Sequence, residues 1–184
     1  CALPICGADL AIKMFEHTQK LGVTYAYGNV IGIRDKGKVK VVVTDDKEYL
    51  GTTVIIATGT INRKLGVQGE NELQGRGISW CAICDGAFFR DKDVVVIGGG
   101  NSALEEALYL SGICRKVTII HRRDEFRAQK LVQNRVLDNP RITQLMDSVV
   151  VSFNAQNSKL NSVTVKNVRT NKLHEILCDG AFIY

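Results

Sequence analysis

The residues of this sequence with the clearest capacity for chemistry are two cysteines separated by two residues, Cys81 and Cys84. Such a pair can be a redox-active dithiol, half of a zinc site, or two small buried side chains. Zinc usually needs four ligands, and the sequence has neither a second C-x-x-C nor a suitably spaced histidine pair. Asp85 and Gly86 follow directly and are typical of a turn, which disfavours inert packing. A redox disulfide is the favoured interpretation, and Asp85, although an Asp before Gly is most often a turn residue, is a candidate acid or base.

A glycine-rich stretch follows the cysteines and fits the pattern G-x-G-x-x-A through Gly98, Gly100 and Ala103. In dinucleotide-binding proteins this pattern gives a tight strand-to-helix turn and lets the backbone approach a pyrophosphate. The free N–H groups of the helix start then face the anion. The motif alone is weak, because a structural glycine turn looks the same. Here an apolar strand precedes it and an amphipathic helix follows, as a βαβ unit requires.

A basic cluster ends the next apolar run and consists of His121, Arg122, Arg123 and Arg127. Sites for NADH usually place Asp or Glu here to accept from the ribose 2′-hydroxyl. A carboxylate would repel a 2′-phosphate, whereas a guanidinium binds it through two parallel hydrogen bonds. The cluster therefore favours NADPH over NADH. The alternative is a solvated basic face without a ligand.

Composition excludes only a few classes of function. The chain has 184 residues, 45% hydrophobic content and a formal net charge of +5. That charge is too mild and too evenly spread to indicate nucleic-acid binding, and no apolar run approaches the length of a membrane span. Residues 1–7 lack the features of a signal peptide. The six cysteines show no regular spacing, which favours a reducing compartment and predicts a cytoplasmic protein.

The pattern of apolar residues predicts the elements that position these motifs. In the first part of the chain it predicts a helix and then short strands, over residues 9–21, 24–27, 30–34, 38–43 and 53–57. Glycine and polar residues at 66–77 predict a linker. In the second part it predicts strands around the glycine motif, a further helix and a three-stranded meander, over residues 93–97, 117–120, 128–137, 148–153, 162–168 and 172–177. The fold class is therefore α/β, with residues 178–184 expected to return to the parallel sheet.

The order of a C-x-x-C-D-G segment, a G-G-G-N-S-A turn and an H-R-R strand end resembles the low-molecular-weight thioredoxin reductases. The resemblance covers nearly the whole chain. It implies a Rossmann-like FAD/NAD(P)-binding fold with two dinucleotide-binding domains. Residues 1–72 would be part of the FAD domain, 73–178 the NADPH domain with its redox disulfide, and 179–184 the start of a return to the FAD domain. The family's first glycine fingerprint and closing Gly-Asp segment are missing from this sequence, so a partial chain is expected.

The resemblance also implies roles for individual residues. Cys84 would face the flavin, Cys81 would attack the disulfide of thioredoxin, and Asp85 would donate a proton. The pyrophosphate side of NADPH would be held by Gly98, Gly100, Asn101, Ser102 and Ala103. Its 2′-phosphate would be surrounded by His121, Arg122, Arg123 and Arg127, and the strand end at Ala57, Thr58 and Gly59 would lie against FAD. The implied activity is NADPH-dependent reduction of thioredoxin by a homodimeric flavoprotein.

Two other functions remain open at this stage. The flavoprotein subunit of alkyl hydroperoxide reductase shares this core and adds an N-terminal redox domain. A non-catalytic NADPH-binding module is expected instead if the chain is complete as given. Ferredoxin–NADP reductases of the same build lack the C-x-x-C, so Cys81 and Cys84 argue against them.

Overall fold

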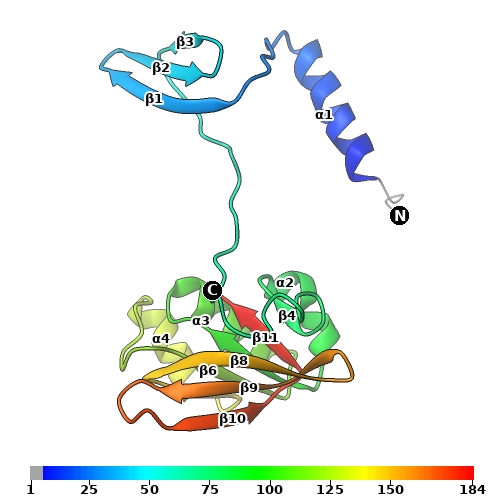
Figure 1. Ribbon diagram of the computed structural model, residues 1–184, viewed down its shortest axis with the longest axis vertical. Helices are drawn as coiled ribbons and strands as arrows, with labels where there is room; N and C mark the ends of the chain where they lie inside the picture. Colours follow the sequence, from blue (N-terminus) through cyan, green and yellow to red (C-terminus); the bar gives the residue numbers. More distant parts are fainter. Residues whose placement is uncertain (1–5) are drawn as a thin grey trace. The chain divides into compact units, whose positions relative to one another are not determined.

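The computed structural model describes residues 6–184 and divides into two compact units. Unit 1 ends at Gly59, and unit 2 comprises Thr60–Tyr184. Figure 1 shows the elements of each unit, which are described separately below.

Residues 6–59 of unit 1 form one helix and one small antiparallel sheet. Helix α1 (Gly7–Lys20) agrees with the helix predicted for residues 9–21, and none of its residues is buried. The sheet has the order β1-β2-β3, from β1 (Val30–Lys36), β2 (Val39–Thr44) and β3 (Glu48–Gly51). The first two strands were predicted, whereas β3 was not. Its burial alternates, but four residues are too few to stand out in the sequence.

Two predicted strands of unit 1 are wrong. Residues 24–27 and 53–57 form no strand, and Ile55 is 89% exposed. An apolar sequence becomes a strand only when a neighbouring strand accepts and donates its backbone hydrogen bonds. Within residues 6–184, no strand pairs with either segment.

Unit 2 is built on a five-stranded parallel sheet with the order β4-β11-β5-β6-β7. The strands, in that order, are Ile78–Ser79, Gly180–Ile183, Asp93–Ile97, Lys116–Ile120 and Ile142–Leu145. The last strand in the chain, β11, thus lies next to β5, which carries the glycine motif at its end. Residues 178–184 do return to the parallel sheet, as predicted, and they do so inside unit 2.

Different layers cover the two faces of this sheet (Figure 1). Helices α3 (Asn101–Ser111) and α4 (Lys130–Leu137) pack on one face. An antiparallel meander of β8 (Ser148–Gln156), β9 (Lys159–Asn167) and β10 (Leu173–Leu177) packs on the other. The meander and the βαβ unit that contains the glycine motif confirm the predicted α/β fold.

The central strand β5 shows why the sheet is sandwiched. Successive side chains of a strand point to opposite faces. Val94 and Val96 join the core under the helices, whereas Val95 and Ile97 join the core under the meander. All four are at most 8% exposed. An unbroken apolar run is the pattern of a strand that is buried on both sides.

The segment predicted as a linker, residues 66–77, is part of unit 2 and contacts strand β8. The carbonyl oxygen of Gln68 accepts a hydrogen bond of 2.9 Å from the N–H of Phe153 on β8. A Cβ atom at Gly69 would lie 2.2 Å from the Phe153 oxygen, so only glycine allows this approach. Residues 60–72 therefore lie in unit 2 here. The assignment of residues 1–72 to an FAD domain stays a prediction, and its first five residues lie outside the described part of the chain.

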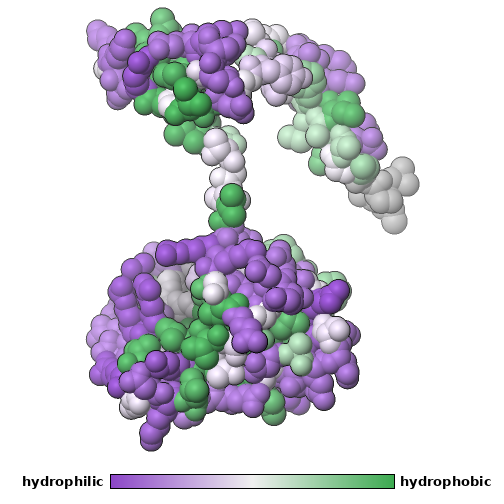
Figure 2. All heavy atoms as spheres, viewed as in Figure 1, coloured by the Kyte–Doolittle hydropathy of each residue, from purple (hydrophilic) through white to green (hydrophobic). Residues whose placement is uncertain are grey.

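The visible face of unit 2 in Figure 2 is mainly hydrophilic, with a smaller hydrophobic area. Among the helices of residues 6–184, none combines the length and apolar character needed to cross a membrane.

Candidate functional site

The glycine turn between β5 and α3 has the geometry that the motif predicts. Gly98 has a φ of +153°, and a Cβ atom there would lie 2.8 Å from the Cβ of Ala103. The first glycine and the final alanine of the motif therefore pack directly against each other, which brings the helix close to the strand. A Cβ atom at Gly100 would meet nothing within 4 Å. The turn is thus tightly packed beneath Gly98 and open at Gly100, where α3 begins.

This turn forms one wall of a cavity of about 630 Å³ in unit 2. Asn101, Ser102 and Ala103 from the first turn of α3 also line it. The start of an α-helix has N–H groups without intrahelical partners and a positive end of the helix dipole. An open turn of this kind fits a pyrophosphate, which is the group that the motif predicts.

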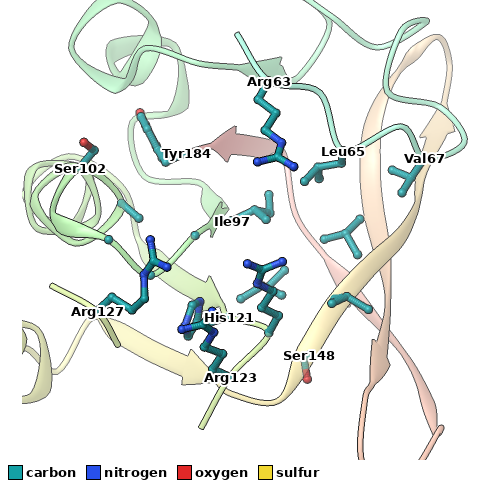
Figure 3. Close-up of a pocket in the computed structure, with 18 of the residues that line it drawn as sticks. Arg63, Leu65, Val67, Ile97, Ser102, His121, Arg123, Arg127, Ser148 and Tyr184 are labelled. Carbon is teal, nitrogen blue, oxygen red and sulfur yellow. The ribbon is translucent and has the colours of Figure 1, made fainter. Parts of the chain in front are cut away.

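Basic side chains dominate the polar lining of the cavity. Arg122, Arg123 and Arg127 follow β6, and Arg63 and Lys64 come from the segment before β4. Figure 3 shows Arg63 and Arg127 reaching into the cavity from different segments. The lining formed by described residues contains no Asp or Glu. A cluster of guanidinium groups without a carboxylate suits a ligand with several phosphate charges.

His121 lies in the same wall but is buried rather than presented to solvent. It is 8% exposed, and a Cβ atom at Gly99 would lie 2.3 Å from its ring. Its Nε2 is 3.1 Å from the carbonyl oxygen of Glu125, with which it shares a hydrogen bond. Burial lowers the pKa of His121, and the nearby charges of Arg123, Arg122 and Arg127 lower it further. His121 therefore packs as a neutral ring between the glycine turn and the basic loop.

Backbone hydrogen bonds hold both ends of the basic loop, which comprises residues 122–127. The N–H of Arg127 donates to the carbonyl of Gly99 at 2.8 Å, and the N–H of Asp147 donates to the carbonyl of Arg123 at 3.0 Å. The guanidinium of Arg169 joins Asp124 at 2.6 Å and Asp147 at 2.9 Å. The loop that carries the arginines is thus fixed to the glycine turn on one side and to the meander on the other.

Cys81 and Cys84 form a disulfide with a Cα–Cα distance of 5.3 Å. They bracket the start of the short helix α2 (Ala82–Asp85), which the 3₁₀ turn η1 (Gly86–Phe89) follows. The backbone N–H of Cys84 donates to the Sγ of Cys81 at 3.2 Å. Cys84 is exposed and Cys81 is partly buried, so reagents in solution can reach the pair.

Asp85 is held by a residue that the sequence did not single out. The hydroxyl of Ser79 donates to Asp85 Oδ2 at 2.6 Å, and the same oxygen of Ser79 accepts from the N–H of Cys81 at 3.0 Å. Ser79 is only 6% exposed. The carboxylate is therefore linked through one buried hydroxyl to the backbone of the first cysteine.

The structure brings the nucleotide motif and the basic cluster to one cavity and keeps the disulfide outside its lining. Ala57, Thr58 and Gly59 are exposed residues of unit 1, and their contact with FAD stays a prediction. The sequence did not identify four residues that line the cavity or bond to the disulfide segment, namely Arg63, Lys64, Ser79 and Tyr184. The only signal for the first two was that two basic residues stand next to each other, between Ile61 and Leu65. Ser79 and Tyr184 gave none, since Ser79 bonds to Asp85 and Tyr184 to the backbone of Ala82 only in the folded chain.

The whole described chain matches a known family. The model of the family described as pyridine nucleotide-disulphide oxidoreductase matches residues 5–184. A thioredoxin reductase from Bacillus subtilis (strain 168) is 47% identical over 180 residues, which are 98% of this chain and 57% of that protein. A thioredoxin reductase from Treponema pallidum (strain Nichols) is 42% identical, over 59% of its length. The chain thus spans somewhat more than half of the length of these relatives.

Solved structures give the same picture. The thioredoxin reductase of Lactococcus lactis, in what is named its FR conformation, superposes with a TM-score of 0.73 at 47% identity. The thioredoxin reductase of Giardia duodenalis superposes with a TM-score of 0.82 at 31% identity. Each comparison covers 98% of this chain and 59% of the solved one.

Proposed function

This chain belongs to the pyridine nucleotide-disulphide oxidoreductase family, and we propose that it is the NADPH-binding and disulfide-bearing part of a thioredoxin reductase. The observation that carries the proposal is the presence, in one compact unit, of the Cys81–Cys84 disulfide and a basic dinucleotide cradle. A nicotinamide cofactor and a redox disulfide in one unit are what NADPH-dependent disulfide reduction requires.

In this proposal the cavity of unit 2 holds NADPH. Gly98, Gly100 and the first residues of α3, Asn101, Ser102 and Ala103, bind its pyrophosphate. The guanidinium groups of Arg122, Arg123 and Arg127 bind its 2′-phosphate, with His121 packed behind them. Arg63 and Lys64 add positive charge on the opposite side of the cavity. These contacts favour NADPH over NADH because a 2′-phosphate offers anionic acceptors that a 2′-hydroxyl lacks.

FAD, when bound, would supply the two-electron relay between NADPH and the disulfide. We assign its binding in this chain to unit 1, with Ala57, Thr58 and Gly59 as contacts. The basis is the resemblance, together with the names of the relatives.

In this proposal the cysteines are first reduced and then react with thioredoxin by thiol–disulfide exchange. Two electrons and two protons convert the Cys81–Cys84 disulfide to two thiols, with Asp85 placed to donate a proton. The Cys81 thiol gives up its proton to the Asp85 carboxylate, and the resulting thiolate attacks one sulfur of oxidised thioredoxin. A mixed disulfide forms, and the other thioredoxin sulfur leaves as a thiolate, to which Asp85 returns the proton. Cys84 then attacks the Cys81 sulfur, which releases reduced thioredoxin and restores the disulfide. Ser79 holds the Asp85 carboxylate next to the backbone of Cys81 during these steps.

We further propose that the complete protein acts as a cytoplasmic homodimer with thioredoxin as its protein substrate. The names of the relatives support the choice of thioredoxin. The irregular cysteine spacing supports a cytoplasmic location. The resemblance supports the homodimer.

The test is turnover by the complete protein with FAD, NADPH and oxidised thioredoxin. The variants Cys81→Ser and Cys84→Ser should each abolish thioredoxin reduction and leave NADPH binding unchanged. Cys6→Ser is a matched control, because Cys6 is an exposed free cysteine of unit 1, whereas the disulfide lies in unit 2. Undiminished turnover in both Cys81→Ser and Cys84→Ser would refute the proposed role of the disulfide.

A further inference from the structure

Tyr184 lies between the cavity and the disulfide, and no motif in the sequence marks it. Its backbone N–H donates to the carbonyl of Ile97 at 2.9 Å, so it continues the pairing of β11 with β5. Its side chain lines the cavity next to the glycine turn (Figure 3). A Cβ atom at Gly98 would lie 3.0 Å from the carbonyl oxygen of Tyr184. The backbone of Tyr184 is therefore fixed against the strand that ends in the dinucleotide motif.

The hydroxyl of the same side chain contacts the disulfide turn. It accepts a hydrogen bond of 3.1 Å from the backbone N–H of Ala82, the residue directly after Cys81. Ala82 is completely buried and begins helix α2, where backbone N–H groups have no intrahelical acceptor. Leaving such a buried donor without a partner costs roughly as much as a lost hydrogen bond. Tyr184 thus satisfies a backbone group within the C-x-x-C segment from 102 positions along the chain.

We propose that Tyr184 is a positioning residue that couples occupancy of the NADPH cavity to the geometry and reactivity of the Cys81–Cys84 pair. The inference rests on the proposed function, since it takes NADPH or NADP⁺ as the ligand of the cavity. The same side chain is a wall of the cavity through its ring and an anchor of the disulfide turn through its hydroxyl.

The coupling arises because the ring and the hydroxyl of Tyr184 belong to one rigid side chain and cannot move independently of each other. A ligand that fills the cavity contacts the Tyr184 ring and restricts its motion. The backbone of the residue is held by β5, so a change at the ring is transmitted to the bond between the hydroxyl and Ala82. Ligand binding and the ordered form of the turn therefore favour each other, which is a coupling free energy between two sites. A bound ligand should make the turn more rigid and slow the reactions of its thiols.

The phenol keeps its proton across the working pH range. Burial raises the pKa of Tyr184 to about 12, and the charges of Glu106 and Asp85 also raise it. The Tyr184 hydroxyl thus remains a neutral acceptor for the Ala82 N–H.

The chain has a built-in reporter for this coupling. Trp80 is its only tryptophan, directly precedes Cys81, and packs against the core under the meander. The experiment titrates the 184-residue chain with NADP⁺ and follows Trp80 fluorescence, while calorimetry measures binding independently. After reduction with dithiothreitol, the alkylation rates of Cys81 and Cys84 by iodoacetamide are measured by peptide mass spectrometry, with and without NADP⁺.

The variant Tyr184→Phe keeps the ring in the cavity and removes the bond to Ala82. Tyr109→Phe is the matched control, because Tyr109 is a half-exposed tyrosine of the neighbouring helix α3 that does not line the cavity. In the unmodified chain and in Tyr109→Phe, saturating NADP⁺ should change Trp80 fluorescence and slow alkylation. We expect a slowing of about fivefold or more, which is the lower end of a typical coupling factor, because alkylation proceeds from the less ordered form of the turn. In Tyr184→Phe, calorimetry should still detect NADP⁺ binding, whereas both responses should be largely lost.

Two results would overturn the proposal without affecting the NADPH site. One is NADP⁺ binding to the unmodified chain with no change in Trp80 fluorescence or alkylation rate, which requires no variant at all. The other is an undiminished response in Tyr184→Phe. Absence of NADP⁺ binding in calorimetry would instead refute the proposed function on which the coupling rests.

Discussion

At the scale of single residues, we propose that the arginines after β6 decide which nucleotide the cavity prefers. Arg122 and Arg123 are both exposed and line the cavity, and their loop is tied to the glycine turn and to the meander. A fixed loop presents guanidinium groups without a large loss of conformational entropy on binding. We therefore expect these two side chains to carry most of the discrimination between NADPH and NADH.

Replacing both Arg122 and Arg123 with Ala should remove the preference for NADPH. Each lost charge-assisted contact costs about 1.5–3 kcal/mol at most, while NADH binding has no 2′-phosphate to lose. Calorimetric titration of the chain with NADP⁺ and NAD⁺ gives the ratio of affinities. Arg135→Ala, an exposed arginine of α4 that does not line the cavity, is the control. An unchanged ratio in the double variant would show that other residues read the 2′-phosphate.

The buried ring of His121 predicts a pH dependence of stability. Its pKa is lowered from 6.5 in the folded chain, chiefly by burial, so the unfolded chain binds a proton at a higher pH than the folded one. This contribution to stability is complete above the unfolded value and is lost as the pH falls through the folded value. The free energy of unfolding should therefore decrease on acidification below about pH 6.5.

The variant His121→Gln isolates this effect, since its amide can still donate to the carbonyl of Glu125 but cannot titrate. Urea unfolding between about pH 7 and about pH 5 should show a weaker pH dependence in the variant than in the unmodified chain. Carboxylates titrate in both proteins and cancel in the difference. Equal pH dependence in the two would mean that the folded chain accommodates a protonated His121.

At the scale of elements, the turn between β5 and α3 assigns different tasks to neighbouring glycines. A Cβ atom at Gly99 would collide with the ring of His121, whereas one at Gly100 would enter open space. The first position is required for packing, and the second leaves room for a ligand. Two adjacent substitutions should therefore separate stability from binding.

Gly99→Ala should destabilise the chain by about 1–3 kcal/mol, as is usual for overpacking, because the His121 ring must move. Gly100→Ala should leave the thermal midpoint nearly unchanged and weaken NADP⁺ binding, because the methyl group projects toward the space proposed for the pyrophosphate. Thermal unfolding and calorimetry measure the two effects. A stable Gly99→Ala variant, or full NADP⁺ affinity in Gly100→Ala, would contradict this division of roles.

Local sequence predicted those elements whose periodicity reflects burial within unit 2. Helix α3 and the meander were predicted because each buries residues at its own period, and strand β5 was predicted because its apolar run is buried on both faces. The predicted strand at residues 53–57 fails because an apolar run does not specify the partner that would pair with it. Arg63, Ser79 and Tyr184 could not be predicted, since their contacts join segments that only the folded sheet brings together.

At the scale of the whole molecule, unit 2 combines a dinucleotide cavity and a disulfide that do not share a lining. Electrons from a nucleotide in the cavity need a relay to reach the sulfur atoms, which the proposed FAD would provide. This chain covers 57% of the Bacillus subtilis relative, so the complete protein is the proper material for testing that transfer. Unit 2 contains the disulfide and the residues that we propose to select the nucleotide.

Thiol trapping after a single addition of NADPH tests whether NADPH reduces the Cys81–Cys84 disulfide. The complete protein, loaded with FAD and kept anaerobic without thioredoxin, is mixed with NADPH or NADH and quenched with iodoacetamide. Peptide mass spectrometry then reports the state of Cys81 and Cys84. We predict that NADPH reduces the disulfide, so that both cysteines of the peptide are alkylated, and that NADH does so far more slowly. A disulfide that stays intact while NADPH is consumed would contradict it.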